Sequence, residues 1–244
     1  MEFNDHTRLG QIAATFPPSM RIFEAHGLDY CCGGQRELGE ACAAAGFAPE
    51  KVLDELQKLR SSHLEVAKDW SKGSLTELIE HLVATHHVFT RTELARLAPL
   101  MDKVARVHGE NHPELNTIRT FFIQMSDDLR PHLMKEEQVL FPYILALEAG
   151  QTSASCFGTV ANPIRAMLAE HDLVGELLHR IRDLSMDFAL PEGACGSYQS
   201  LFMGLADLEA DLHQHIHLEN NVLFPKAVAL EDARLLQHNN LVNT

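Results

Sequence analysis

Apolar side chains recur every three or four residues over four long stretches of the chain, which is the spacing of an amphipathic α-helix. These stretches run from Ser74 to about Ala105, Glu114 to Glu148, Asn162 to Phe188 and Tyr198 to Leu230. The first opens with a capping box, Ser74 to Glu77, and the third with Asn162 as N-cap before Pro163. Because short polar connections join the stretches, the pattern predicts an all-α, up-down-up-down four-helix bundle.

A separate small helical unit is expected before the bundle. Its predicted helices are Leu9–Thr15, Ser19–His26, Glu37–Ala45 and Glu50–Arg60. Apolar periodicity then weakens between Ser61 and Gly73. We therefore expect a small helical domain over residues 1–60, a linker over 61–73 and the bundle over 74–244.

One motif occurs in both the second and the fourth long stretch. The segments His132 to Pro142 and His215 to Pro225 agree at every His, Glu, Val, Leu, Phe and Pro of the pattern HxxxExxVLFP. Histidine and glutamate four residues apart share one face of a helix, and the apolar spacing turns that face toward the core. Pro131 and Pro142 are expected to kink the second helix.

The motif repeat also selects histidines on the other two helices. Nearly equal lengths of chain separate His87 from His132 and His171 from His215, so each half of the bundle offers one histidine and one HxxxE pair. The predicted ligands are His87, His132, Glu136, His171, His215 and Glu219. Imidazole with carboxylate is a ligand mixture of non-haem iron or manganese. Two facing glutamates can bridge a pair of metal ions and leave positions open for water, an oxo bridge, dioxygen or nitric oxide.

A single HxxxE pair on a helix is more often an ordinary surface contact than a metal site. Its repetition in a matched apolar context favours metal, because a core does not bury two carboxylates without a cation. The neighbouring histidines are expected to be solvated or to support the ligands; they are His81, His86, His213 and His217. For Glu137 and Glu170 the preferred interpretation is solvated surface charge, and the alternative is an acid that supports a ligand. The LFP repeats are expected to serve helix packing and kinking instead of chemistry.

Two adjacent cysteines, Cys31 and Cys32, stand in the segment DYCCGG of the small unit. If a helix began there, its dipole would favour the thiolate and make both cysteines candidate redox or metal-handling groups. The equally acceptable alternative is that they pack a turn. Packing is the only role expected of Cys42, Cys156 and Cys195.

Charge and composition narrow the classes of partner. The net charge of −14 argues against nucleic acid and anionic membranes. No stretch approaches the 18 or so apolar residues of a membrane helix, and no signal-peptide pattern opens the chain. Five cysteines without an even framework fit a reducing compartment, so we expect a cytoplasmic protein.

The four-helix pattern with its HxxxE motifs resembles the haemerythrin-like family. Together with DYCCGG at Asp29 to Gly34, it resembles the iron-sulfur cluster repair di-iron proteins of the RIC or ScdA type, from Leu9 to about Ala229. The resemblance implies two iron ions at the six predicted ligands, with Glu136 and Glu219 as bridges beside an oxo or hydroxo group. It departs from oxygen-carrying haemerythrins at Gly175, where they place a further histidine.

The resemblance implies a stress-response protein that helps repair iron-sulfur clusters damaged by nitrosative or oxidative stress, by supplying iron from a labile di-iron centre. Cys31 and Cys32 would assist as redox or iron-transfer thiols. The implied partners are damaged iron-sulfur proteins or the cluster assembly machinery, with nitric oxide or dioxygen as small ligands and a monomer or homodimer as the working form. The alternatives are an enzyme that reduces nitric oxide to nitrous oxide, and a protein that binds nitric oxide or dioxygen reversibly as a buffer or sensor.

Overall fold

The computed structural model describes residues 3–61, 68–151 and 157–242, with side chains as far as residue 237. Over these ranges the chain is helical and contains no β-strand, only an isolated antiparallel bridge between Arg8 and Glu37. The all-α prediction is confirmed. Residues 62–67 of the predicted linker (61–73) lie outside the described residues.

The chain divides into two compact units. The first comprises Met1–Ile79, Ile144–Ser155 and His213–Thr244, and the second comprises Glu80–Tyr143 and Cys156–Leu212. Helices α5 (Leu75–His81), α8 (Phe141–Glu148) and α10 (Gly196–Leu218) each contribute residues to both units.

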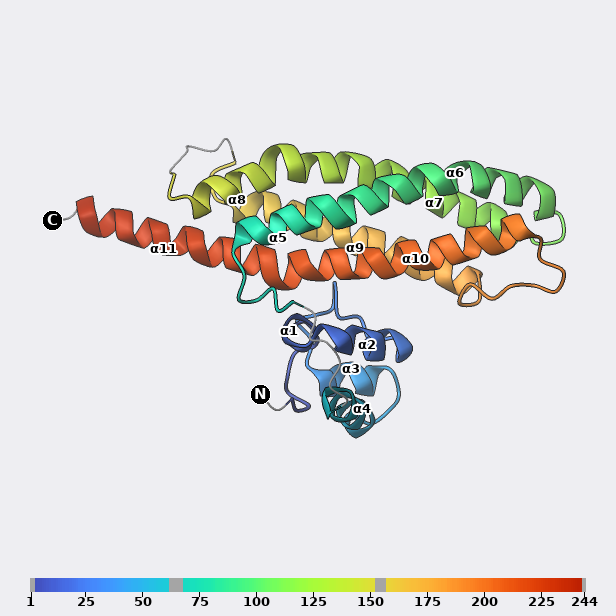
Figure 1. Ribbon diagram of the computed structural model, residues 1–244, viewed down its shortest axis with the longest axis horizontal. Coiled ribbons are helices and arrows are strands. Elements are labelled where there is room, and N and C mark those ends of the chain that lie inside the picture. Colours follow the sequence, from blue (N-terminus) through green and yellow to red (C-terminus); the bar gives the residue numbers. More distant parts are fainter. Residues whose placement is uncertain (1–2, 62–67, 152–156, 243–244) are drawn as a thin grey trace. The chain divides into compact units, whose positions relative to one another are not determined.

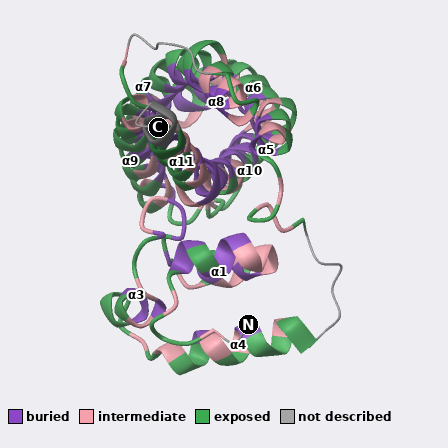
Figure 2. Ribbon diagram, turned by 90° about the vertical axis from the view of Figure 1, so that its left-hand side faces the viewer, coloured by how far each residue is buried: buried purple, intermediate pink, exposed green. Residues whose placement is uncertain are grey.

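The second unit is the four-helix bundle. It is built from α6 (Val88–His108), α7 (Glu114–Lys135), α9 (Ala161–Leu184) and most of α10. Figure 1 shows these long helices side by side, and α7 packs against both α6 and α9. Their buried residues face the inside of the ring of helices in Figure 2. Leu97, Phe122, Leu178 and Leu205 are among the buried core side chains, as the apolar pattern predicted.

The third long helix differs from its prediction at both ends. Helix α9 begins at Ala161 with Val160 as N-cap, so Asn162 is not the cap. The Asn162 side-chain amide instead donates to the Phe157 carbonyl at 2.8 Å, and Pro163 fits the first turn, where its missing N–H has no helical acceptor to lose. The helix ends at Leu184, before the left-handed backbone that starts at Met186 (φ 52°).

The first unit holds the predicted small helical domain. Its helices are α1 (Leu9–Thr15), a 3₁₀ turn at Pro17–Ser19, α2 (Met20–Ala25), α3 (Leu38–Ala44) and α4 (Pro49–Ser61). Leu9, Ile12, Phe23, Leu38 and Val52 are each at most 1% exposed and form one core cluster. Every predicted helix of this segment is present to within about a residue, because short helices between strong breakers are well marked in sequence.

The start of α5 is also in the first unit, and the capping bond from Ser74 that the sequence predicted there is confirmed. The Glu77 amide donates to Ser74 Oγ at 3.1 Å. The Glu148 carboxylate accepts the amides of Leu75 and Thr76, each at 2.8 Å. The free N–H groups of this helix end are therefore satisfied by side chains.

Asn221, which follows α10 on the same helical rod, fits against the small domain within the first unit. Its side-chain amide donates to the carbonyls of Tyr30 (3.2 Å) and Cys31 (3.1 Å). A Cβ built on Gly10 would lie 2.3 Å from Asn221 Oδ1, and one on Gly34 would lie 2.5 Å from the same atom. Glycine at both positions is what allows this close approach.

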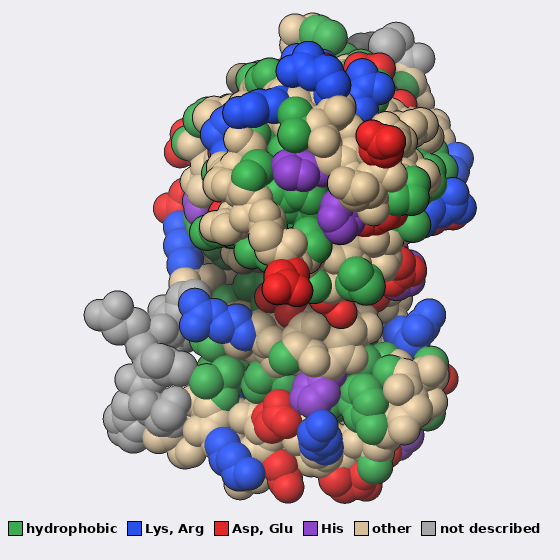
Figure 3. Space-filling model, turned by 90° about the vertical axis from the view of Figure 1, so that its right-hand side faces the viewer, with side chains coloured by type: hydrophobic (Ala, Val, Ile, Leu, Met, Phe, Trp, Pro, Cys, Tyr) green, Lys and Arg blue, Asp and Glu red, His purple; other side chains and the backbone are tan. Residues whose placement is uncertain are grey.

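No helix in the described ranges is long and apolar enough to span a membrane. On the face drawn in Figure 3, several Lys and Arg side chains lie near one another at the top, and both acidic and basic side chains are scattered over the rest.

Candidate metal centre

Three π-helical turns interrupt the α-helices where the predicted ligands lie. They are η2 (Leu82–His87), η3 (Glu136–Leu140) and η4 (Glu219–Leu223). Two of them begin at a predicted glutamate ligand and one ends at a predicted histidine ligand. A π-turn adds a residue to the helical repeat and re-aims the side chains beside it, which is why such turns gather at functional sites.

The LFP sequences explain where two of these turns end. Pro142 and Pro225 stand two residues beyond the last residues of η3 and η4. Since proline has no N–H for the regular bond to the carbonyl four residues earlier, the wider turn falls where that bond is missing. Around Pro131, by contrast, α7 continues as an α-helix without interruption.

Four of the six predicted ligands come together within the bundle unit. Glu136 Oε2 lies 3.5 Å from His87 Nε2, and Glu136 Oε1 lies 3.3 Å from His132 Nε2. His171 Nε2 lies 3.1 Å from His132 Nε2. All four side chains are at most 2% exposed. Three imidazole nitrogens therefore converge around one buried carboxylate from three helical segments.

The other two predicted ligands form a matching pair in the first unit. His215 Nε2 lies 3.2 Å from Glu219 Oε1, and both side chains are at most 1% exposed. The two HxxxE motifs thus adopt the same local arrangement, with Nε2 of the histidine toward the carboxylate four residues on.

The ligand atoms of the six residues fall into two overlapping groups. In each group, one ligand atom from every residue lies within 4.8 Å of the others. One group is His87, Glu136, His215 and Glu219, and the other is His132, Glu136, His171 and Glu219. Glu136 and Glu219 belong to both groups.

Glu136 shows most directly that these side chains fit a cation. Its carboxylate is 0% exposed, and among the described residues neither of its oxygens accepts a hydrogen bond. Burying a carboxylate without such donors is costly unless a positive charge accompanies it. A metal ion bound by imidazole and carboxylate would supply that charge, and this donor set suits non-haem iron.

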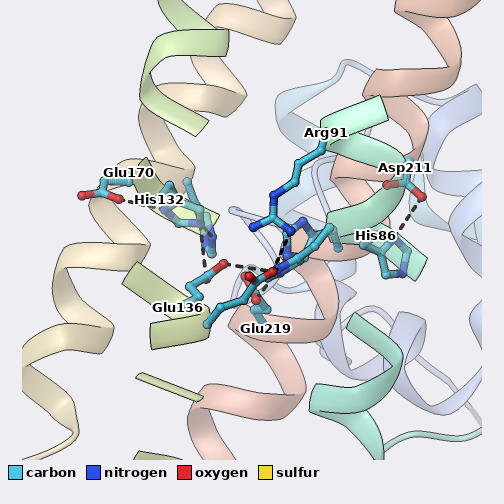
Figure 4. Close-up of polar contacts among 11 residues, drawn as sticks. His86, Arg91, His132, Glu136, Glu170, Asp211 and Glu219 are labelled. Carbon is cyan, nitrogen blue, oxygen red and sulfur yellow. Dashed lines mark hydrogen bonds and ion pairs between the residues drawn. The ribbon is translucent and has the colours of Figure 1, made fainter. Parts of the chain in front are cut away.

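Two acidic side chains contact the ring nitrogens of His87 and His132 that face away from the site. His87 Nδ1 lies 2.8 Å from Glu137 Oε1, which also accepts Arg91 Nη1 at 2.8 Å. His132 Nδ1 lies 2.8 Å from Glu170 Oε2, and Lys135 pairs with the other oxygen of Glu170. Figure 4 shows Glu170 on the far side of His132 from Glu136. Donation from Nδ1 leaves the lone pair on Nε2, the atom directed at the site.

The expectation that Glu137 and Glu170 are solvated surface charges is therefore wrong. Burial opposes the charge of each carboxylate, but hydrogen bonds from Arg91 and His87 outweigh it and hold the pKa of Glu137 below its usual value. The pKa of Glu170 is lowered in the same way by Lys135 and His132, against the effect of burial. Both residues stay ionised and able to accept from the imidazoles.

The four histidines next to the predicted ligands differ in burial and in their contacts. His86 is buried and lies 2.9 Å from Asp211 Oδ1, and His217 is 1% exposed beside the ring of Tyr30. Burial lowers the pKa of His217 to about 4, and its contact with the Tyr30 backbone opposes this only in part. His81 and His213 are half-buried. A solvated role is excluded for His86 and His217.

The cysteine pair lies in an irregular segment, because the next helix, α3, starts only at Leu38. No helix begins beside the thiols, so a helix dipole does not favour their thiolates. The contact with Cys32, burial and the negative charge of Asp29 together raise the pKa of Cys31 well above its usual value. Cys31 is therefore a buried thiol and not an acidic thiolate. Cys42 is buried and Cys195 exposed, and Cys156 lies outside the described residues.

The bundle and its histidine and glutamate side chains define a haemerythrin-type cation-binding protein. Residues 77–227 match the Hemerythrin HHE cation binding domain, and residues 5–60 match ScdA_N, described as a domain of unknown function (DUF542). The chain is 36% identical over 223 residues to relatives named iron-sulfur cluster repair protein YtfE from Escherichia coli strain K12 / DH10B and Shigella boydii serotype 4. The match covers 91% of this chain and 97% of each relative. The chain belongs to this iron-sulfur cluster repair protein family.

Sequence patterns missed the π-turns, and for the two carboxylates that contact the histidines they favoured surface charge over the supporting role. The repeated VLFP text marks both turns that precede a proline, and Glu137 and Glu170 stand directly beside predicted ligands. Adjacent residues on a helix point in different directions, so adjacency to a ligand alone could not show which histidine each carboxylate contacts.

Proposed function

We propose that this protein holds two iron ions in the bundle and supplies iron to repair iron-sulfur clusters damaged by nitrosative or oxidative stress. The observation that carries the proposal is the sharing of Glu136 and Glu219 by two groups of buried ligand atoms. Membership of the repair family supports the function. The name of these relatives supports damaged iron-sulfur proteins, or the machinery that assembles their clusters, as the partners.

The grouping of ligand atoms supports a specific division of labour. His87 and His215 would bind one ion, His132 and His171 the other, and Glu136 and Glu219 would bridge the two. Each ion would then have two histidines and a share of two carboxylates from the protein. The remaining positions would take an oxo or hydroxo bridge, water, or a small ligand such as nitric oxide or dioxygen.

The chain's own residues set how firmly iron is held. Glu137 and Glu170 hold Nδ1 of His87 and His132, so that Nε2 is presented to the site. Glu136 and Glu219 are 0% exposed, so bulk solvent does not reach their carboxylates. When bound, iron would offer open coordination positions at which ligands can exchange. Because the protein would give each ion few ligands, the ion could be released.

We place this function in the cytoplasm, with a monomer or homodimer as the working form. Five cysteines without the even framework of a disulfide scaffold support a reducing compartment.

The proposal is tested by iron transfer. Iron-loaded protein is incubated with an acceptor whose cluster nitric oxide has destroyed, together with sulfide and reductant, and cluster recovery is followed by electron paramagnetic resonance. We expect recovery to match the iron lost from the bundle, and to fail with Glu136→Gln. Equal recovery with that variant would contradict the proposal. Nitrous oxide formed over many turnovers would instead indicate a nitric oxide reductase.

A further inference from the structure

A second cluster of possible ligands lies in the small domain. One ligand atom from each of Asp29, Cys31 and Cys32 lies within 4.8 Å of the others. Cys31 Sγ lies 3.2 Å from Asp29 Oδ1 and 4.0 Å from Cys32 Sγ. None of these residues belongs to the histidine and glutamate groups of the bundle.

The separations match two edges of a coordination tetrahedron. With metal–sulfur bonds of about 2.3 Å and metal–oxygen bonds of about 2.0 Å, ligand sulfurs lie about 3.8 Å apart and sulfur and oxygen about 3.5 Å apart. The distances of 4.0 and 3.2 Å fall on either side of these values. Small rotations of the side chains would bring all three atoms onto one ion.

The proton on Cys31 marks where an ion would sit. The thiol donates to Asp29 Oδ1, so a cation that replaced this proton would lie between the sulfur and the carboxylate oxygen. Each thiol would release one proton to solvent, and the ion would neutralise the thiolates so formed. The negative charge of Asp29, which helps to raise the pKa of Cys31 in the absence of an ion, would then attract the ion.

The loop is held in this conformation before any ion arrives. Asp29 Oδ1 accepts the amides of Cys31 (3.1 Å) and Cys32 (2.9 Å), and Oδ2 accepts the amide of Gly33 (2.9 Å). From the other side, the Asn221 amide binds the carbonyls of Tyr30 and Cys31. A loop fixed from both sides loses little conformational entropy when it binds.

Solvent can reach this cluster of three residues. Asp29 is exposed, Cys32 is half-buried and Cys31 is buried. Three protein ligands leave the fourth tetrahedral position for water or for a donor from another molecule.

We propose that Asp29, Cys31 and Cys32 form a second cation site, which takes a thiophilic divalent transition-metal ion such as Fe²⁺. The site goes beyond the proposed function, because it shares no ligand with the bundle and stands whether or not the bundle binds two irons. Asn221 directly links this loop to the π-turn that begins at Glu219.

Cobalt titration of the reduced, metal-free full chain tests this site. Thiolate bound to Co²⁺ absorbs in the near ultraviolet by charge transfer, whereas Co²⁺ on histidine and glutamate does not. We expect a saturable sulfur band with one proton released per thiol. Cys31→Ser and Cys32→Ser should each lower that band by at least half, and the double variant should abolish it. Asp29→Asn keeps an oxygen for the loop amides and should weaken binding by about tenfold or more.

Cys42→Ser and Cys195→Ser are the matched controls, and both should leave the band unchanged. Absence of a sulfur band at any Co²⁺ excess would overturn the proposal, as would a band that survives the Cys31→Ser/Cys32→Ser double variant. Iron loading of the bundle is measured on the same preparations by Mössbauer spectroscopy. A chain that holds two irons but gives no sulfur band would refute the second site alone.

Discussion

Glu137 and Glu170 each contact a buried histidine on one side and a cation on the other. The paired cation keeps the carboxylate ionised, and the ionised carboxylate keeps Nδ1 of the imidazole protonated. Each residue thereby sets the tautomer that presents Nε2 to the predicted metal site. Two residues that make no contact with metal are thus expected to control how well it binds.

Replacing either carboxylate by an amide should weaken iron binding. Glu137→Gln and Glu170→Gln keep the side-chain shape but lose the charge that holds Nδ1–H, so we expect iron affinity to fall roughly 10- to 100-fold. Competition with a chelator measures this affinity. Glu176→Gln, which removes an exposed pairing with Arg180 on the same helix as Glu170, is the control. If all three variants bind iron alike, this role is disproved.

His217 gives a prediction for pH. Its folded pKa of about 4 lies below the ordinary value of 6.5 because the ring is buried. A lowered folded pKa means that the neutral imidazole contributes stability above pH 6.5, and that this contribution is lost as the pH falls toward 4. The shift corresponds to about 3 kcal/mol at most.

Urea unfolding of the metal-free protein between pH 4 and pH 7 measures this loss. In His217→Leu, which cannot be protonated, the fall in unfolding free energy over this range should be smaller by up to about 3 kcal/mol. An identical fall in both proteins would show that His217 does not titrate as predicted.

At the scale of single residues, sequence found the ligand candidates but misjudged their surroundings. The His132 and Glu136 pair could be predicted because helical spacing alone places both side chains on one face. The raised pKa of Cys31 could not, because it depends on burial and on the neighbouring carboxylate of Asp29. The contact between Glu170 and His132 joins two helices, so local spacing could not show it.

At the scale of helices and turns, regular periodicity was a good guide and its interruptions were not. The segment predicted as one helix from Glu114 to Glu148 is continuous, but it contains the π-turn η3 between α7 and α8. A single added residue in a long helix barely alters the apolar pattern. The π-turns at Glu136 and Glu219 change where these side chains point relative to a regular α-helix, and only the three-dimensional structure reveals this change.

The junction of η4 with the small domain can be tested through Gly34. A Cβ at Gly34 would lie 2.5 Å from Asn221 Oδ1 and 2.6 Å from the Tyr30 carbonyl oxygen. Gly34→Ala should therefore lower the free energy of unfolding by about 1–3 kcal/mol, which urea unfolding measures. At Gly196 nothing lies within 4 Å of the added atom, so Gly196→Ala should not destabilise. Equal stability of both variants would mean that the close approach is absent.

At the scale of the whole molecule, the repeat of one motif explains why the bundle could be predicted. Two similar halves each supply a histidine helix and an HxxxE helix, and four amphipathic helices with short connections pack as a bundle. The link between Asn221 and the cysteine loop joins positions far apart in the sequence. No local pattern encodes that contact, and so the anchoring of the small domain on η4 was not predicted.

The bridged di-iron centre is the central claim, and iron content with Mössbauer spectra tests it most directly. We expect two magnetically coupled irons per chain in the native protein, and loss of coupling or of iron in both Glu136→Ala and Glu219→Ala. Full retention of coupled iron in either variant, or native protein that binds no iron when supplied with it, would contradict the shared-carboxylate centre.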